Sequence, residues 1–249
     1  MADPLHQFVI EPWIPLEVGD LDLSFTKSSF FMVLGLVVST VFLSSAISRK
    51  ALIPGRAQIF AEMLYEFVAN MIRSNLGSKG QQYFSFVFTM FVIVLMGNLL
   101  GMLPYSFTYT SHIAVTGALA LLVFFMVTII GFIRHGLHFL SLFCPPGAPL
   151  WLTPLIVPIE IISFLSRPLT LSLRLFINMF AGHLLLKVIA GFCLAMVGSL
   201  GTVGFIAALL PVGFNVLFIG FEIFIALIQA YVFALLTCIY LKDTIEIAH

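Results

Sequence analysis

The chain has 249 residues, of which 61% are hydrophobic and only 9% are charged. A water-soluble core of this size does not require such a composition, so the surrounding solvent is expected to be lipid. The 11 basic residues balance the 11 acidic ones and no lysine-rich arm is present, so we expect no nucleic-acid partner. The apolar runs are apolar on every side, which favours helices over alternating barrel strands.

The first 28 residues are expected to form an extramembrane segment. They carry five acidic residues against Lys27 alone, and three prolines interrupt them. The segment lacks the basic start and short apolar core of a cleaved signal peptide. A single membrane domain is therefore expected over residues 29–249, and it begins with a span at 29–47.

The charges that flank the first spans predict the orientation of the chain. Arg49, Lys50 and Arg56 follow the first span, whereas the loop after the second span, at 84–103, has no basic residue. By the positive-inside rule the N-terminus lies on the outer, periplasmic side. Between these spans, residues 57–75 have apolar positions at helical spacing and predict an amphipathic helix on the inner surface.

A third span is predicted at about 114–133. It ends at Arg134, which we expect to anchor it at the interface. His135 and His138 follow in an HxxH spacing, but no third ligand is near, so they are interpreted as interfacial residues. Several prolines then predict a loop over 135–150.

The last two hydrophobic regions, 150–196 and 202–241, are unusually long. Each has about 40 residues or more, or roughly 60 Å of helix, twice the thickness of a bilayer core. Either each region contains two short helices or each is one strongly tilted helix. No polar stretch interrupts them, so we favour a hairpin of two tilted helices joined near Gly198–Gly204. The predicted fold class is an all-α polytopic membrane protein with about five membrane-embedded helices and one interfacial helix.

Ionisable residues inside these two helices are the default functional sites, because they are costly in lipid. On the first, the helical period places five side chains on one stripe and His183 on nearly the opposite side; the stripe holds Glu160, Arg167, Thr170, Arg174 and Asn178. On the second, three polar side chains share one face; they are Glu222, Gln229 and Asp243. Antiparallel packing would place Glu222 near His183 and Gln229 near Arg174.

This set of side chains is suited to proton transport. An arginine cannot lose its proton, whereas histidine and glutamate can take up and release protons along an aqueous path. The sequence has no phosphate-binding loop, no dinucleotide fingerprint and no HExxH motif. The cysteines, Cys144, Cys193 and Cys238, fit neither a disulfide framework nor a zinc site, so we expect no metal and no cofactor.

The segment from Ser172 to His183, SLRLFINMFAGH, strongly resembles the signature of subunit a of the F-type ATP synthase. Pro158-Ile-Glu160 upstream, GNLLGMLP at 97–104, Glu222 and IQAYVF at 228–233 extend the resemblance in order over nearly the whole chain. The His/Glu order at 183 and 222 is similar to that of mitochondrial and α-proteobacterial members.

The resemblance implies a role for each matching residue. Arg174 would face the rotating c-ring and attract each ring carboxylate, with Asn178 and Gln229 as its polar neighbours. Glu160 would serve the half-channel on the inner side, while His183 and Glu222 would serve the one on the outer side. The implied partners are the c-ring, b-type stator subunits and lipid, in a bacterial or mitochondrial inner membrane. The chain itself would catalyse no nucleotide chemistry.

Two other functions use buried charges. A proton-coupled secondary transporter would show internal repeats, and no self-similarity between the halves is visible. A haem- or quinone-binding subunit would need paired midplane histidines, whereas only His183 lies deep in a span.

Overall fold

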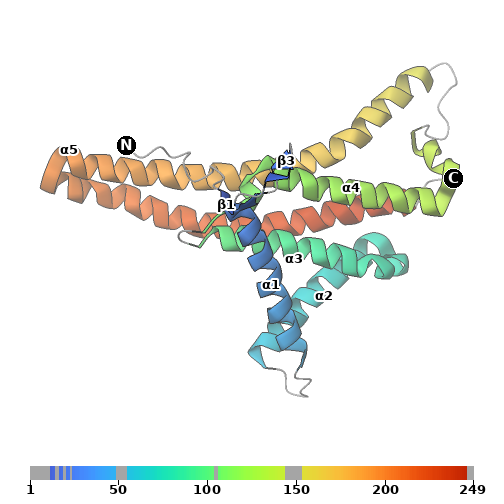
Figure 1. The fold of residues 1–249 in the computed structure, drawn as a ribbon, viewed down its shortest axis with the longest axis horizontal. Helices are drawn as coiled ribbons and strands as arrows, with labels where there is room; N and C mark the ends of the chain where they lie inside the picture. Colours follow the sequence, from blue (N-terminus) through green and yellow to red (C-terminus); the bar gives the residue numbers. More distant parts are fainter. Residues whose placement is uncertain are drawn as a thin grey trace. The chain divides into compact units, whose positions relative to one another are not determined.

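A computed structural model describes residues 12–14, 17–18, 21–22, 24–48, 55–103, 106–143 and 153–245. Most of these residues are helical (Figure 1). The helices are α1 (Lys27–Ser48), α2 (Arg56–Leu76), α3 (Phe84–Gly101), α4 (Ile113–His135) and α5 (Thr153–Ile245). Short 3₁₀ segments connect them: η2 (Gly77–Tyr83), η3 (Tyr109–Ser111) and η4 (Gly136–Phe143). These bounds agree within a few residues with the helices expected from the sequence.

Five helical stretches are long and apolar enough to cross a membrane; they are Lys27–Ile47, Arg56–Gly101, Ile113–His135, Thr153–Ser199 and Gly201–Ile245. Large apolar side chains remain exposed on them, for example Leu36, Ile133 and Phe205. Exposed apolar side chains on helices suit a lipid environment, where helices satisfy their own backbone hydrogen bonds. The predicted all-α polytopic membrane fold is therefore confirmed.

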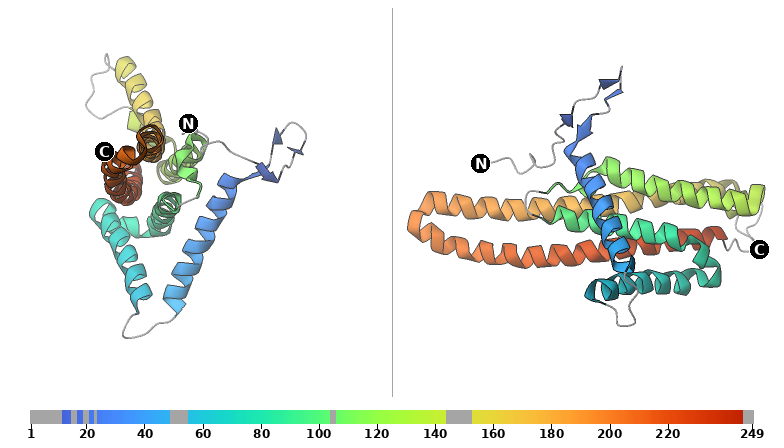
Figure 2. Two further views of the ribbon diagram at one scale, coloured as in Figure 1. Left: turned by 90° about the vertical axis from the view of Figure 1, so that its left-hand side faces the viewer. Right: turned by 60° about the horizontal axis from the view of Figure 1, so that its bottom comes forward.

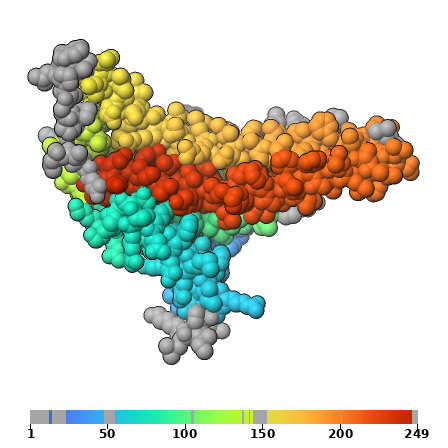
Figure 3. All heavy atoms as spheres, turned by 180° about the vertical axis from the view of Figure 1, so that it is seen from behind, coloured from blue at the N-terminus to red at the C-terminus, as the bar shows by residue number. Residues whose placement is uncertain are grey.

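Helix α5 is a hairpin, because its backbone turns at Gly201. That residue has φ 56° and ψ −127°, a conformation in the left-handed half of φ space that favours glycine. We call Thr153–Ser199 the first arm and Gly201–Ile245 the second arm. Over residues 175–230 the two arms run back beside each other from this turn (Figures 1 and 2), and they lie against each other in the space-filling view (Figure 3). Of the two alternatives, one long helix per region is correct.

The chain divides into two compact units. Unit 1 contains residues 1–42, 92–112 and 175–230, and unit 2 contains residues 43–91, 113–174 and 231–249. Each unit therefore holds part of both arms of α5.

In unit 1, Tyr109 packs where α1 and α3 carry glycines. A Cβ at Gly97 would meet its phenol oxygen at 2.6 Å, and one at Gly35 would meet it at 3.5 Å. The phenol donates a hydrogen bond to the Ile93 carbonyl at 3.1 Å, and the side chain is almost fully buried. Burial raises the pKa of Tyr109 to about 12, so the phenol stays protonated. This contact fixes the segment that follows α3.

In unit 2, aromatic rings pack between α4, η4 and the first arm. Phe139 and Phe164 are buried, and the Phe124 ring lies 5.0 Å from the Phe164 ring between centroids. Gly131 leaves room for this packing, since a Cβ there would meet Phe139 at 2.6 Å and Thr244 at 2.8 Å. The aromatic cluster thus holds α4, η4 and the first arm together within unit 2, and Thr244 of the second arm packs against α4 at Gly131.

Helix α2 is amphipathic, and only part of its apolar face is buried. Val68, Met71 and Ile72 lie in the core of unit 2, whereas Phe60 and Met63 are exposed. The helix ends at Gly77, whose φ of 60° favours glycine.

Two local features were not anticipated. Four short strands precede α1: β1 (Pro12–Ile14) pairs antiparallel with β4 (Phe25–Thr26), and β2 (Glu17–Val18) with β3 (Leu21–Asp22). The predicted loop over 135–150 is wrong for its first part, which forms η4 because Phe139 and Phe143 pack on the aromatic cluster. Its prolines, and with them Cys144, lie outside the described residues.

Candidate functional site

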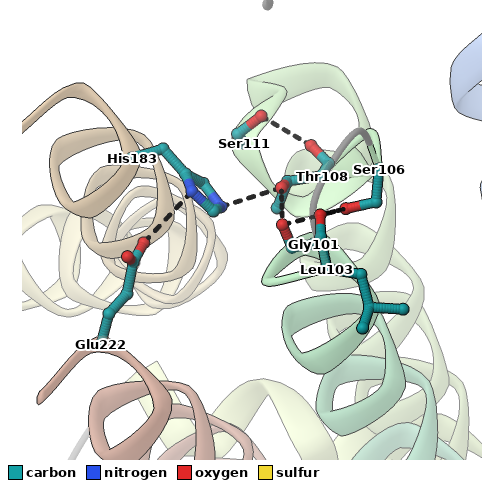
Figure 4. Close-up of polar contacts among 7 residues, drawn as sticks. All are labelled: Gly101, Leu103, Ser106, Thr108, Ser111, His183 and Glu222. Atoms are coloured by element: carbon teal, nitrogen blue, oxygen red, sulfur yellow. Dashed lines mark hydrogen bonds and ion pairs between the residues drawn. The ribbon is translucent and has the colours of Figure 1, made fainter. Parts of the chain in front are cut away.

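His183 on the first arm and Glu222 on the second arm face each other in unit 1 (Figure 4). Nδ1 of His183 lies 3.4 Å from Oε1 of Glu222, and the two side chains are 13% and 5% exposed. Gly182 makes this approach possible, because a Cβ there would meet the Glu222 carboxyl carbon at 2.9 Å. The predicted closeness of these two residues is confirmed.

The other ring nitrogen of His183 contacts the segment between α3 and η3. Nε2 lies 2.8 Å from Oγ1 of Thr108, and Thr108 Oγ1 lies 3.2 Å from the Gly101 carbonyl oxygen (Figure 4). Gly101 is required here, since a Cβ at that position would collide with the Thr108 side chain. The imidazole is thus held between a carboxyl group and a hydroxyl group.

A cavity of about 540 Å³ opens beside this ring in unit 1. Its lining includes His183, Thr108 and Lys187, and three further polar side chains; these are Lys27, Ser106 and Ser111. The volume has room for several water molecules, each of which occupies about 30 Å³ in the liquid, and the polar lining offers them partners. The cavity is therefore large and polar enough to hold water beside the ring.

His112 lies next to this segment, at the end of η3. Its ring stacks on Phe107, with centroids 5.0 Å apart. Burial lowers the pKa of His112, so this histidine stays uncharged at neutral pH.

Two amide side chains also join elements of unit 1. Asn178 on the first arm donates to Oε1 of Gln229 on the second at 2.8 Å. Asn98 of α3 is fully buried and donates to the Ala226 carbonyl at 3.3 Å. Both bonds join helices, and the Asn98 bond agrees with the expected role of polar residues between membrane helices.

Unit 2 contains a different charged pair. Nη1 of Arg167 lies 3.0 Å from Oδ2 of Asp243, with side chains 23% and 39% exposed. The guanidinium also lies over two aromatic rings, at 5.6 Å from the Phe164 centroid and 5.3 Å from that of Tyr240. Ion pair and cation–π contacts both hold Arg167 in a fixed position between the arms.

Arg174 and Glu160, in contrast, make no hydrogen bond or ion pair with any residue that the structure describes. The Arg174 side chain is exposed and that of Glu160 is half-buried. A guanidinium on a membrane helix needs a counter-charge or water, so Arg174 is available to a partner outside this chain.

The sequence had located most of these side chains but not all of their contacts. It anticipated His183 with Glu222, and it did not anticipate a contact with Thr108. The Thr108–His183 contact joins residues 75 positions apart, and the Arg167–Asp243 pair was missed. The one available signal for that pair was opposite charge on two helices expected to pack together.

Among the residues described, no group of three His, Cys, Asp or Glu side chains could hold a metal ion. Cys238 is buried and Cys193 is partly buried. Arg134 lies over the Tyr83 ring, 5.8 Å from its centroid, at the end of α4.

Comparison with known proteins agrees with this arrangement. Residues 29–242 match the family described as ATP synthase A chain. The chain is 55% identical over 246 residues to ATP synthase subunit a of Rhodospirillum rubrum, with 99% of each chain covered. It is 54% identical over 244 residues to that of Rhizobium etli (strain CIAT 652), covering 98% of this chain and 97% of the relative. Both the family match and these near full-length identities show that the chain belongs to the ATP synthase subunit a family.

Proposed function

We propose that this chain, as the proton-translocating subunit of an F-type ATP synthase, presents Arg174 to carboxylates of a rotating c-ring. The exposed guanidinium, unpaired within the described part of the chain, is the observation that carries this proposal. A permanent cation favours the ionised form of a passing carboxyl group and so promotes release of its proton. The same charge repels protons and opposes direct leakage past the ring.

The outer half-channel is assigned to the cavity beside His183 and Glu222. Water in the cavity reaches His183, and the ring can exchange a proton with the Glu222 carboxyl group on its other side. Asn178, which follows Arg174 closely in the sequence, and its hydrogen-bond partner Gln229 then contribute polar side chains to the path.

The inner half-channel is assigned to Glu160. Its carboxyl group is half-buried on the first arm and makes no hydrogen bond within the described residues, so water or another subunit must solvate it. A proton released from the ring would leave along this acid.

The orientation and partners follow from the same proposal. The N-terminal segment, residues 1–28, lies on the outer side of a bacterial inner membrane, and residues 29–249 form one membrane domain. The distribution of basic residues around α1 and α2 supports this orientation. Besides the c-ring, b-type stator subunits contact the chain. Family membership does not favour the alternative of a secondary transporter.

The decisive experiment replaces Arg174 by alanine in the complete complex. Arg174→Ala is expected to abolish ATP synthesis driven by a proton gradient in membrane vesicles, a loss of at least about 100-fold, because no other group supplies the fixed charge. Arg134→Ala is the matched control, since that arginine is also exposed and lies over Tyr83 at a helix end. Synthesis at the parental rate by assembled Arg174→Ala complexes would refute the proposal.

A further inference from the structure

Thr108 lies outside α5, lines the cavity and contacts His183 through its hydroxyl group. Its side chain is 7% exposed, and its hydroxyl lies within hydrogen-bond distance of both His183 Nε2 and the Gly101 carbonyl oxygen. A hydroxyl group has one proton to donate and lone pairs to accept with. Whether the Thr108 hydroxyl donates or accepts the hydrogen bond with His183 therefore depends on whether Nε2 carries a proton.

Two arrangements satisfy these contacts. When Nε2 carries a proton, it donates to Thr108 Oγ1, and the hydroxyl donates in turn to the Gly101 carbonyl. When Nε2 is bare, the hydroxyl turns and donates to it. In the second arrangement the Ser106 hydroxyl can donate its single proton to the Gly101 oxygen at 3.1 Å, in place of the Leu103 carbonyl oxygen at 2.7 Å (Figure 4). The Thr108 hydroxyl can therefore bond to the ring in every protonation state.

The bond from Thr108 is important for the orientation of the ring, because the contact between Nδ1 and Glu222 is weak. At 3.4 Å the separation of Nδ1 and Glu222 Oε1 is longer than the 2.7–3.2 Å of an ordinary hydrogen bond. Neither Glu222 oxygen has a hydrogen-bond partner within the described residues. Of the two contacts of the ring, the one to Thr108 is the shorter and sets the direction in which Nδ1 points.

We propose that Thr108 is a positioning residue for proton transfer, which holds the His183 ring toward Glu222 throughout the protonation cycle of the imidazole. The proposal rests on the proposed function, since it assumes that this pair carries protons. Gly101 has a supporting part: with no Cβ, it lets the Thr108 side chain lie against the end of α3. No group transfer by Thr108 itself is required.

The test is passive proton flux through the membrane part of the assembled complex, after removal of the catalytic head. Thr108→Val keeps the shape and loses the hydroxyl, so the flux should fall about fivefold, the effect of one lost hydrogen bond. The pH at which flux is half-maximal should also move by about half a unit or more. Thr108→Ser keeps the hydroxyl and should stay within about twofold of the parent.

Thr110→Val is the matched control. Thr110 is fully buried two residues away, and its hydroxyl has no hydrogen-bond partner within the described residues, so the substitution removes no bond. The charged groups facing His183 are the same in all variants: Glu222 from the second arm, Lys187 on its own arm, and Lys27 of α1 across the cavity. A changed pH profile is therefore attributable to Thr108, and a purely structural role would leave that profile unchanged.

Two outcomes overturn the inference: parental flux with an unchanged pH profile in Thr108→Val, or an equal loss in Thr108→Ser. Flux is normalised to assembled complex, and Thr108→Ala replaces the valine variant if that one does not assemble. His183→Ala separates this failure from failure of the proposed function. Loss of flux in His183→Ala beside normal flux in Thr108→Val refutes only the role of Thr108, whereas normal flux in His183→Ala refutes the proton path itself.

Discussion

The two charged pairs that join the arms of α5 differ in almost every physical respect. His183 and Glu222 are separated by 3.4 Å, His183 borders a cavity of about 540 Å³, and both side chains are titratable. Arg167 and Asp243 are separated by 3.0 Å, and two aromatic rings hold the guanidinium, which never loses its proton. A loose pair beside water suits exchange of protons, whereas a tight pair with a permanent cation suits a fixed structure.

The difference shows how one helical hairpin can hold both kinds of site. Short contacts and ring stacking fix the Arg167 pair in unit 2. In unit 1, a glycine beside Glu222 and a threonine beside His183 keep the pair close without a strong bond between its members. Three substitutions therefore test the difference between the two pairs. They remove the titratable proton of Glu222, the space beside it at Gly182, and the negative charge of Asp243.

The largest effect is expected from Glu222→Gln. This substitution removes the titratable carboxyl group from the His183–Glu222 pair. The amide keeps the shape of the side chain and cannot be ionised, so ATP-driven proton pumping should fall by at least about 100-fold, the scale of a positioned acid–base group. Pumping is measured by quenching of a pH-sensitive dye in inverted vesicles. Thr110→Val is again the control, because the Thr110 hydroxyl has no hydrogen-bond partner within the described residues. Gln229→Glu is unsuitable, because Gln229 accepts a hydrogen bond from Asn178. Pumping within tenfold of the parent would show that Glu222 does not carry the protons.

A smaller loss is expected from Gly182→Ala, which closes the gap that lets Glu222 approach. The new Cβ would meet the carboxyl carbon at 2.9 Å and displace it from His183, so pumping should fall about tenfold, as misplaced reacting groups do. Alanine favours the helix by about 1 kcal/mol, so a weaker helix cannot explain the loss. Gly191→Ala is the matched control on the same arm, because a Cβ there meets nothing within 4 Å. Equal pumping by the two variants would contradict the role assigned to Gly182.

The sequence predicted the helices well because their signals are local. Apolar length located α1, α3, α4 and the two arms, and the helical period located α2. The turn at Gly201 was predicted to within a few residues, since glycines punctuate a run that is too long for one crossing. The short strands and η4 were missed because they depend on pairing and on aromatic contacts with distant residues, which periodicity does not report.

For the candidate site, residue identity was predictable and contact was only partly so. Helical spacing and antiparallel packing placed Glu222 near His183, and the structure confirms this. The bond from Thr108 could not be predicted, because it depends on how the segment after α3 folds back against Gly101. Arg167 and Asp243 lay on the expected faces, but side-chain reach decides which charges pair.

The smallest effect is expected from Asp243→Asn, which leaves the Arg167 guanidinium without its counter-charge. Because the pair is partly exposed and its charges are screened by solvent, proton pumping should fall only a few-fold. The physical reason is electrostatic: Asp243 neutralises Arg167, and without it Arg167 stands on the first arm as an uncompensated cation. Protons leaving toward Glu160 would then meet added repulsion.

The double variant Arg167→Gln, Asp243→Asn decides between charge and structure. It removes both charges and keeps an amide at each position, so pumping should return to within about twofold of the parent if the added positive charge caused the loss. If instead the pair acts as a clasp between the arms, the double variant should be no better than Asp243→Asn, because the strong charged bond is absent from both. Recovery would make the contrast between the two pairs one of charge compensation.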